Sequence, residues 1–160
     1  MGYTLKVEGI EELSKKLTAL GDKAGAVASQ ALYAGAGVVA DAYSAACAGI
    51  KAEEFHYVYN GYQRKTSYEE KAALLGKTGI AKFEKTGAEV LTSIGLSGKL
   101  GYVEIAGKRI AVRLLGNAIN KGTYFRVADK AFRNAVNKAK NPASAAIVSK
   151  ADELIEEIMK

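Results

Sequence analysis

The chain has 160 residues and a formal net charge of +6, with one cysteine and one histidine. This length suits a single domain, residues 1–160, that buries its own core, and no repeat or linker divides it. One cysteine excludes an internal disulfide and one histidine excludes a pair of histidine zinc ligands. No window approaches the roughly 20 consecutive apolar residues of a membrane span, and no signal-peptide core is found, so we expect a soluble protein made in the cytoplasm.

The excess positive charge lies in the middle of the chain. Residues 61–122 carry 11 basic and 5 acidic side chains, whereas residues 1–60 carry 5 and 7. A basic region of this kind can face nucleic acid, an acidic partner subunit or water, and the counts do not choose among these.

The first third of the chain predicts one strand and two helices. Residues 3–7 alternate apolar and polar, as in a half-buried strand, and residues 11–20 have apolar side chains at helical spacing. We expect Gly21 to end this helix and Asp22 to cap the next one, over residues 23–47. That second helix is rich in alanine and apolar on nearly all sides, so it is predicted to be central, with Gly35 and Gly37 letting a neighbouring element approach and Cys47 as a small buried hydrophobe.

The middle of the chain predicts a connection, a short helix and strands. Residues 49–62 lose periodicity and are read as a long connection or a short strand. A helix over residues 67–75 follows, with Thr66 or Ser67 as N-cap and Glu69 or Glu70 completing a capping box. Strands are expected at residues 90–96 and 102–106. Residues 109–115 fit either a strand or a helix, and the resemblance described below favours a short helix.

The last part predicts two helices. Residues 127–139 have one apolar face, Asn141-Pro142 ends that helix, and a final helix begins at Ser144 with Ile147, Leu154 and Ile155 facing inward. The predicted fold class is α+β: a small antiparallel sheet packed against a long central Ala-rich helix and two C-terminal helices.

No motif predicts catalysis. The G-x-G-x-x-A of residues 35–40 lacks the preceding strand of a dinucleotide turn, and Gly76-Lys77-Thr78 lacks the first glycine of a P-loop. The paired carboxylates, including Glu69-Glu70, are read as solvated charges because adjacent side chains point apart. We therefore predict no enzyme, and no catalytic, cofactor-binding or metal-binding residues.

Several short motifs occur in an order that is typical of one family. Residues 110–143 contain Ile110-Ala111, then Gly122-Thr123, Phe125, and a basic Ala-rich helix with Lys130-Ala131 and Lys138-Ala139. Earlier motifs are Gly9-Ile10 with Leu13, the stretch 69–75, Gly79-Ile80-Ala81 and Ile94-Gly95. In this order the chain resembles the small neck and tail-completion proteins of long-tailed bacteriophages and their prophages. Asn120-Lys121 and Tyr124 depart from the acidic residue and the proline usual there.

The resemblance implies a structural virion protein that joins head and tail, or completes the head-proximal tail end, as a ring of copies beside other neck and tail proteins. It would be made in the bacterial host cytoplasm. Phe55, Tyr57, Tyr59, Tyr62 and Arg64, aromatic and basic residues outside the periodic elements, are the candidate assembly interface. The alternative is a small basic nucleic-acid-binding module in which these aromatics stack on bases, although we expect nucleic-acid binding to be weak and non-specific at most.

Overall fold

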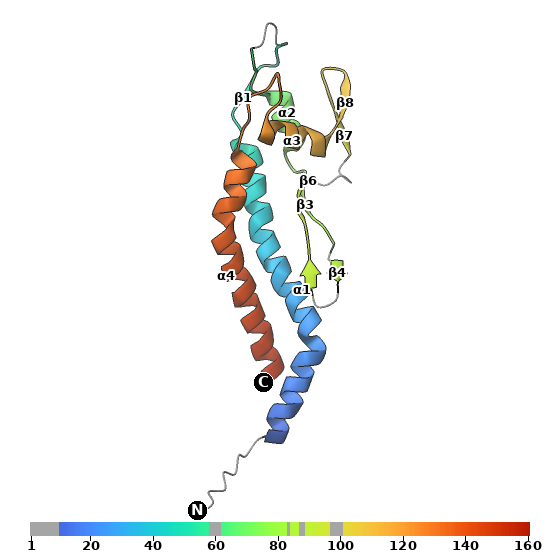
Figure 1. Ribbon diagram of the computed structural model, residues 1–160, viewed down its shortest axis with the longest axis vertical. Coiled ribbons are helices and arrows are strands. Elements are labelled where there is room, and N and C mark those ends of the chain that lie inside the picture. The colour runs from blue at the N-terminus through green and yellow to red at the C-terminus, as the bar shows by residue number, and fades with distance from the viewer. Residues whose placement is uncertain (1–9, 58–61, 83, 87–88, 97–100) are drawn as a thin grey trace, which may run out of the picture.

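The protein is an elongated α+β molecule built along two long helices (Figure 1). The computed structural model describes residues 10–57, 62–82, 84–86, 89–96 and 101–160. The predicted strand over residues 3–7 lies outside this part of the chain. The predicted fold class, α+β, is confirmed: small two-stranded sheets accompany the long helix α1 (Ile10–Gly49), and the chain ends with the helices α3 (Val112–Lys121) and α4 (Ala131–Met159).

The two long helices are α1 (Ile10–Gly49) and α4 (Ala131–Met159), which run side by side along the molecule. Both helices bury small side chains, as expected for helices that pack closely. The buried alanines are Ala31 and Ala36 on α1 and Ala139 and Ala143 on α4. The two helices approach closely at Gly35: a Cβ added there would lie 2.7 Å from Ile147 Cδ1 and 3.0 Å from the Ala143 carbonyl oxygen. Gly37, predicted to play the same part, has no such neighbour within 4 Å.

Three predicted helix boundaries in the long helices are wrong. α1 continues through Gly21 and Asp22, and α4 continues through Pro142. A glycine costs a helix only about 1 kcal/mol, and a proline removes one helical hydrogen bond. Packing of α4 along α1 outweighs the local preference of Pro142, beside which Ala143 is buried, whereas residues 21–26 of α1 are exposed and the helix tolerates the glycine there. Conversely, α4 begins at Ala131 rather than at residue 127, and Val127 is exposed.

Among the described residues, the strands form four separate pairs rather than one sheet. β1 (Ala52–Glu53) pairs in parallel with β2 (Thr66–Ser67). The antiparallel pairs are β3 (Thr78–Ile80) with β6 (Ile94–Leu96), β4 (Glu84–Thr86) with β5 (Glu89–Leu91), and β7 (Tyr102–Ile105) with β8 (Lys108–Ala111). The strand predicted over residues 90–96 is therefore divided between β5 and β6.

The ambiguous segment 109–115 contains both of its alternatives. Its first part is β8, in which Ile110 pairs with Val103, and α3 (Val112–Lys121) starts directly afterwards. The preference for a helix over the whole segment is wrong for residues 109–111. The tight turn before β8 depends on positive φ angles at Ala106 and Gly107, which bring the strands back into register.

The main core lies where α1 ends, between α2 (Tyr68–Leu74), α3 and the start of α4. Cys47 is 1% exposed there, which confirms that it packs as a small hydrophobe. The Phe132 ring stacks on the Tyr43 ring, with centroids 4.5 Å apart. None of the helices in the described part of the chain is long and apolar enough to cross a lipid bilayer.

Candidate interface: an aromatic hollow beside a buried Arg-Glu-Arg cluster

The site is organised by the first turn of α2. The Ser67 hydroxyl accepts a hydrogen bond from the Glu70 backbone N–H (3.2 Å), and Glu70 Oε2 accepts one from the Ser67 backbone N–H (2.8 Å). This is the predicted capping box, made by Ser67 and Glu70 among the alternatives left open. It turns the Glu70 side chain inward, and Glu70 is only 1% exposed.

Two arginines from distant parts of the chain bind this carboxylate. Arg64 donates from Nη1 to Oε2 (2.8 Å) and from Nη2 to Oε1 (2.6 Å). Arg126 donates to the same two oxygens, from Nη1 (2.8 Å) and from Nη2. Both guanidinium groups are buried, so the carboxylate is held by two forks at once in a medium that strengthens charged hydrogen bonds.

Backbone hydrogen bonds hold the two arginines side by side. The Arg64 N–H donates to the Phe125 carbonyl (3.1 Å), and the Val127 N–H donates to the Arg64 carbonyl (3.0 Å). Gln63 Nε2 adds bonds to the carbonyls of Thr123 and Tyr124. The segment before α2 is thereby fastened to the loop before α4.

The cluster stays charged at neutral pH. Burial acts to raise the pKa of Glu70, but the hydrogen bonds from Arg64, Arg126 and the Ser67 backbone outweigh it and lower the pKa from 4.5 to about 2. The bonds to Glu70 raise the pKa of Arg64 despite its burial. Two cations and one anion leave a surplus positive charge. One donor of the cluster, Arg126 Nε, is buried with no hydrogen-bond partner among the described residues.

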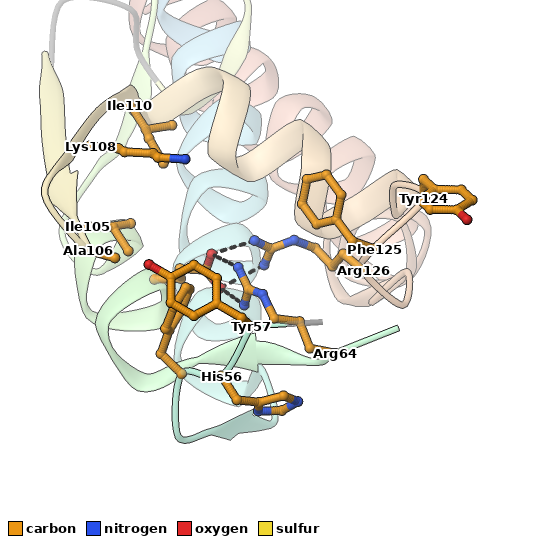
Figure 2. A pocket seen from close by; sticks show the side chains of 12 residues that line it. His56, Tyr57, Arg64, Ile105, Ala106, Lys108, Ile110, Tyr124, Phe125 and Arg126 are labelled. Atoms are coloured by element: carbon orange, nitrogen blue, oxygen red, sulfur yellow. Dashed lines mark hydrogen bonds and ion pairs between the residues drawn. The ribbon is translucent and has the colours of Figure 1, made fainter. Parts of the chain in front are cut away.

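A hollow of about 640 Å³ opens beside the cluster (Figure 2). Four aromatic residues line it, together with the hairpin formed by β7 and β8: Phe55, Tyr57, Tyr124 and Phe125. The rings of Phe55 and Tyr57 meet edge to face with centroids 5.2 Å apart, and the Arg64 guanidinium carbon lies 4.8 Å from the Phe55 centroid. The aromatic wall is thus positioned by the same arginine that binds Glu70.

The aromatic side chains around this hollow are largely open to solvent. Tyr57 is 66% exposed, Phe125 51% and Tyr124 84%. A carboxylate with a pKa of about 2, and with both oxygens bound, is poorly suited to general acid or base chemistry near neutrality. The arrangement is suited instead to binding, with a rigid wall and an exposed aromatic rim.

The five predicted interface residues do not all lie on one surface. Phe55 and Tyr57 line the hollow. Tyr62 is 78% exposed but does not line it, and Tyr59 lies outside the described residues. Arg64, predicted to lie on the surface, is 7% exposed and supports the wall from within.

Further contributors to the site, Arg126 among them, were not predicted as site residues. Tyr124 and Phe125 stand in the loop whose Gly-Thr and Phe carried the family resemblance, so the motif pointed to the segment but not to its exposure. The prediction that Glu70 is a solvated charge is wrong, because its side chain is buried. Its place in the capping box was visible in the sequence, but the two arginines that bury it come from other elements.

Comparisons of the chain with family models, with curated proteins and with solved structures gave no match.

Proposed function

We propose that this protein is a structural component of the phage neck or the head-proximal tail end, which joins or completes the tail through ring-like self-assembly. Its partners are further copies of itself and other neck and tail proteins, and its place is the virion. The aromatic hollow is its principal docking surface. The motif order described above suggests the particle, and the hollow suggests the mode of action.

One observation carries the binding role: exposed aromatic side chains gather around a single hollow that is braced from behind. Tyr57, Tyr124 and Phe125 expose more than half of their surface to water, which is unfavourable for an isolated protein. A few tyrosine and phenylalanine anchors supply most of the energy of many protein interfaces. The buried Glu70 cluster keeps these anchors fixed, so little conformational entropy is lost when a partner binds.

The nucleic-acid alternative is weakened by the position of Arg64. Its guanidinium is bound to Glu70 and beneath the surface, so it is not free to neutralise a phosphate. The aromatic rings beside it are therefore better interpreted as anchors for a protein partner than as stacking platforms for bases.

The test combines two substitutions at the rim, Tyr57→Ser and Tyr124→Ser. Both side chains are exposed, so circular dichroism and the melting temperature should change little. In a phage that encodes the variant, filled heads and finished tails should accumulate separately in electron micrographs. Tyr102→Ser is the matched control, since Tyr102 is 60% exposed and lies outside the hollow.

Normal yields of joined particles from the double variant would remove the hollow from the interface. The neighbouring reading frames provide an independent check on the particle. Portal, capsid and tail-tube genes beside this one are expected, and their absence would contradict the phage assignment.

A further inference from the structure

The hollow has the charge of an acid-binding site. Arg64, Lys108 and Arg126 line it against one carboxylate, Glu70. Both arginines are committed to Glu70, whereas Lys108 is exposed at the rim on β8. Because the surplus positive charge is partly buried, water screens it less than a surface charge. A partner that brings carboxylates together with some apolar surface is the best complement.

The last turns of α4 carry that combination. Val148, Asp152 and Glu156 are spaced four residues apart, so they form one stripe along the helix. All three are exposed, and Val148 exposes 58% of its surface. Glu153 and Glu157 beside the stripe are also exposed, and Lys150 forms an ion pair with Glu153 at 2.7 Å. This end of α4 is therefore acidic, and the apolar residue Val148 begins the stripe.

The two surfaces lie toward opposite ends of the molecule. In Figure 1 the C-terminal end of α4 is far along the long axis from α2, β7 and β8, which surround the hollow. One chain therefore cannot place its own stripe in its own hollow. Only another molecule can bring the two surfaces together.

We propose that the hollow receives the stripe formed by Val148, Asp152 and Glu156 from a second copy of the chain. This inference rests on the assembly role proposed above and names the partner of the same site. The contact joins two different surfaces, so it is heterologous, and each bound copy still offers one free hollow and one free stripe. Successive contacts close into a ring or continue as a filament, depending on the rotation between copies.

The experiment uses two variants, each lacking one half of the contact. Lys108→Glu reverses the exposed charge of the hollow, and Asp152→Lys with Glu156→Lys reverses the stripe. In sedimentation velocity at low salt, the wild type should associate in a concentration-dependent manner, and association should weaken with added salt. Each variant alone should associate at least about tenfold more weakly than the wild type. Asp41→Lys, an exposed charge reversal on α1 outside both surfaces, is the control and should behave as wild type.

Mixing the two variants gives the decisive result. The Lys108→Glu chain keeps an intact stripe and the other variant keeps an intact hollow, so an equimolar mixture should form dimers and associate more strongly than either variant alone. The two reversed surfaces also carry opposite charges, so association of the mixture can continue beyond the dimer. A mixture without dimers would overturn the inference, as would a wild type that stays monomeric. Suppose that one of these two results is obtained and that heads and tails still fail to join in the phage that encodes the Tyr57/Tyr124 variant. The hollow is then still a docking surface, but its occupant is another protein.

Discussion

Arg126 donates two hydrogen bonds to Glu70, which precedes it by 56 residues in the sequence. This contact joins the loop before α4 to the first turn of α2, and Arg64 binds the same carboxylate from the segment before α2. The hollow depends on this cluster of Arg64, Glu70 and Arg126. The cluster holds together the segments that carry the lining residues Phe55, Tyr124 and Phe125.

Removing the central carboxylate should be strongly destabilising. Glu70→Gln leaves two buried guanidinium groups without a counter-charge, and breaking a buried pair costs about 3–5 kcal/mol of unfolding free energy. Glu69→Gln, an exposed neighbour, should cost less than about 0.5 kcal/mol. Ser67→Ala removes only the cap and should cost about 1 kcal/mol. Chemical denaturation of the three variants checks this order, and equal stability of the Glu70 and Glu69 variants would contradict the role given to the cluster.

The same carboxylate should give stability an acid limit. Because the pKa of Glu70 is lower in the folded protein (about 2) than its ordinary value of 4.5, the folded state favours the ionised form. Its contribution is complete above about pH 4.5 and is lost as the pH falls toward about 2. A difference of this size corresponds to about 3 kcal/mol. Unfolding free energies measured across this range should show a loss that is absent in Glu70→Gln, and parallel curves for the two proteins would refute the assignment.

Two glycines in α1 provide a test of the helix pair. Gly35→Ala places a methyl group against Ile147 and the Ala143 carbonyl, so overpacking should cost about 1–3 kcal/mol. Gly37→Ala meets nothing within 4 Å and should stabilise the helix by up to about 1 kcal/mol. Adding Ile147→Ala to Gly35→Ala should recover part of the loss, since the two residues compete for one space. Thermal melts of the set report on this contact, and stabilisation by both glycine substitutions would place α4 elsewhere.

Pro142 tests whether α4 is continuous. A proline inside a helix lacks the N–H that would bond to the carbonyl four residues earlier, and it clashes with that carbonyl. Pro142 is exposed, so Pro142→Ala removes this penalty without emptying a core position. The melting temperature should rise, with a gain of about 1–3 kcal/mol. A loss of stability would indicate that the helix ends at this point.

Nucleic-acid binding should be weak. We expect sequence-independent retention in a gel shift at low salt and none at ~150 mM salt, because binding through phosphate contacts alone falls steeply as salt is added. The informative variant is Lys65→Ala with Lys108→Ala, since both lysines are exposed whereas Arg64 is bound to Glu70. Tight binding at ~150 mM salt that this variant abolishes would favour the nucleic-acid module over the assembly protein.

Local features of this protein are predictable from its amino-acid sequence. The cap of α2 was predictable because Ser67 and Glu70 are three residues apart, which places each side chain at the other's backbone N–H. The Ala-rich composition of α1 and the glycine at position 35 predicted close helix packing, since small side chains at helical spacing leave room for a neighbour. The burial of Cys47 was predictable from the same apolar sequence surroundings. Each of these depends on residues within a few turns of one another.

The long-range features arise from contacts between distant parts of the folded chain. Whether Pro142 ends a helix depends on contacts between α4 and α1, which outweigh a local preference of about 3 kcal/mol. The charges of Glu70, Arg64 and Arg126 have the same sequence signature whether they are solvated or buried. Their burial results from segments about 60 residues apart meeting beside α2, and no local pattern records that meeting. The hollow, formed from these same segments, was therefore visible only in the folded chain.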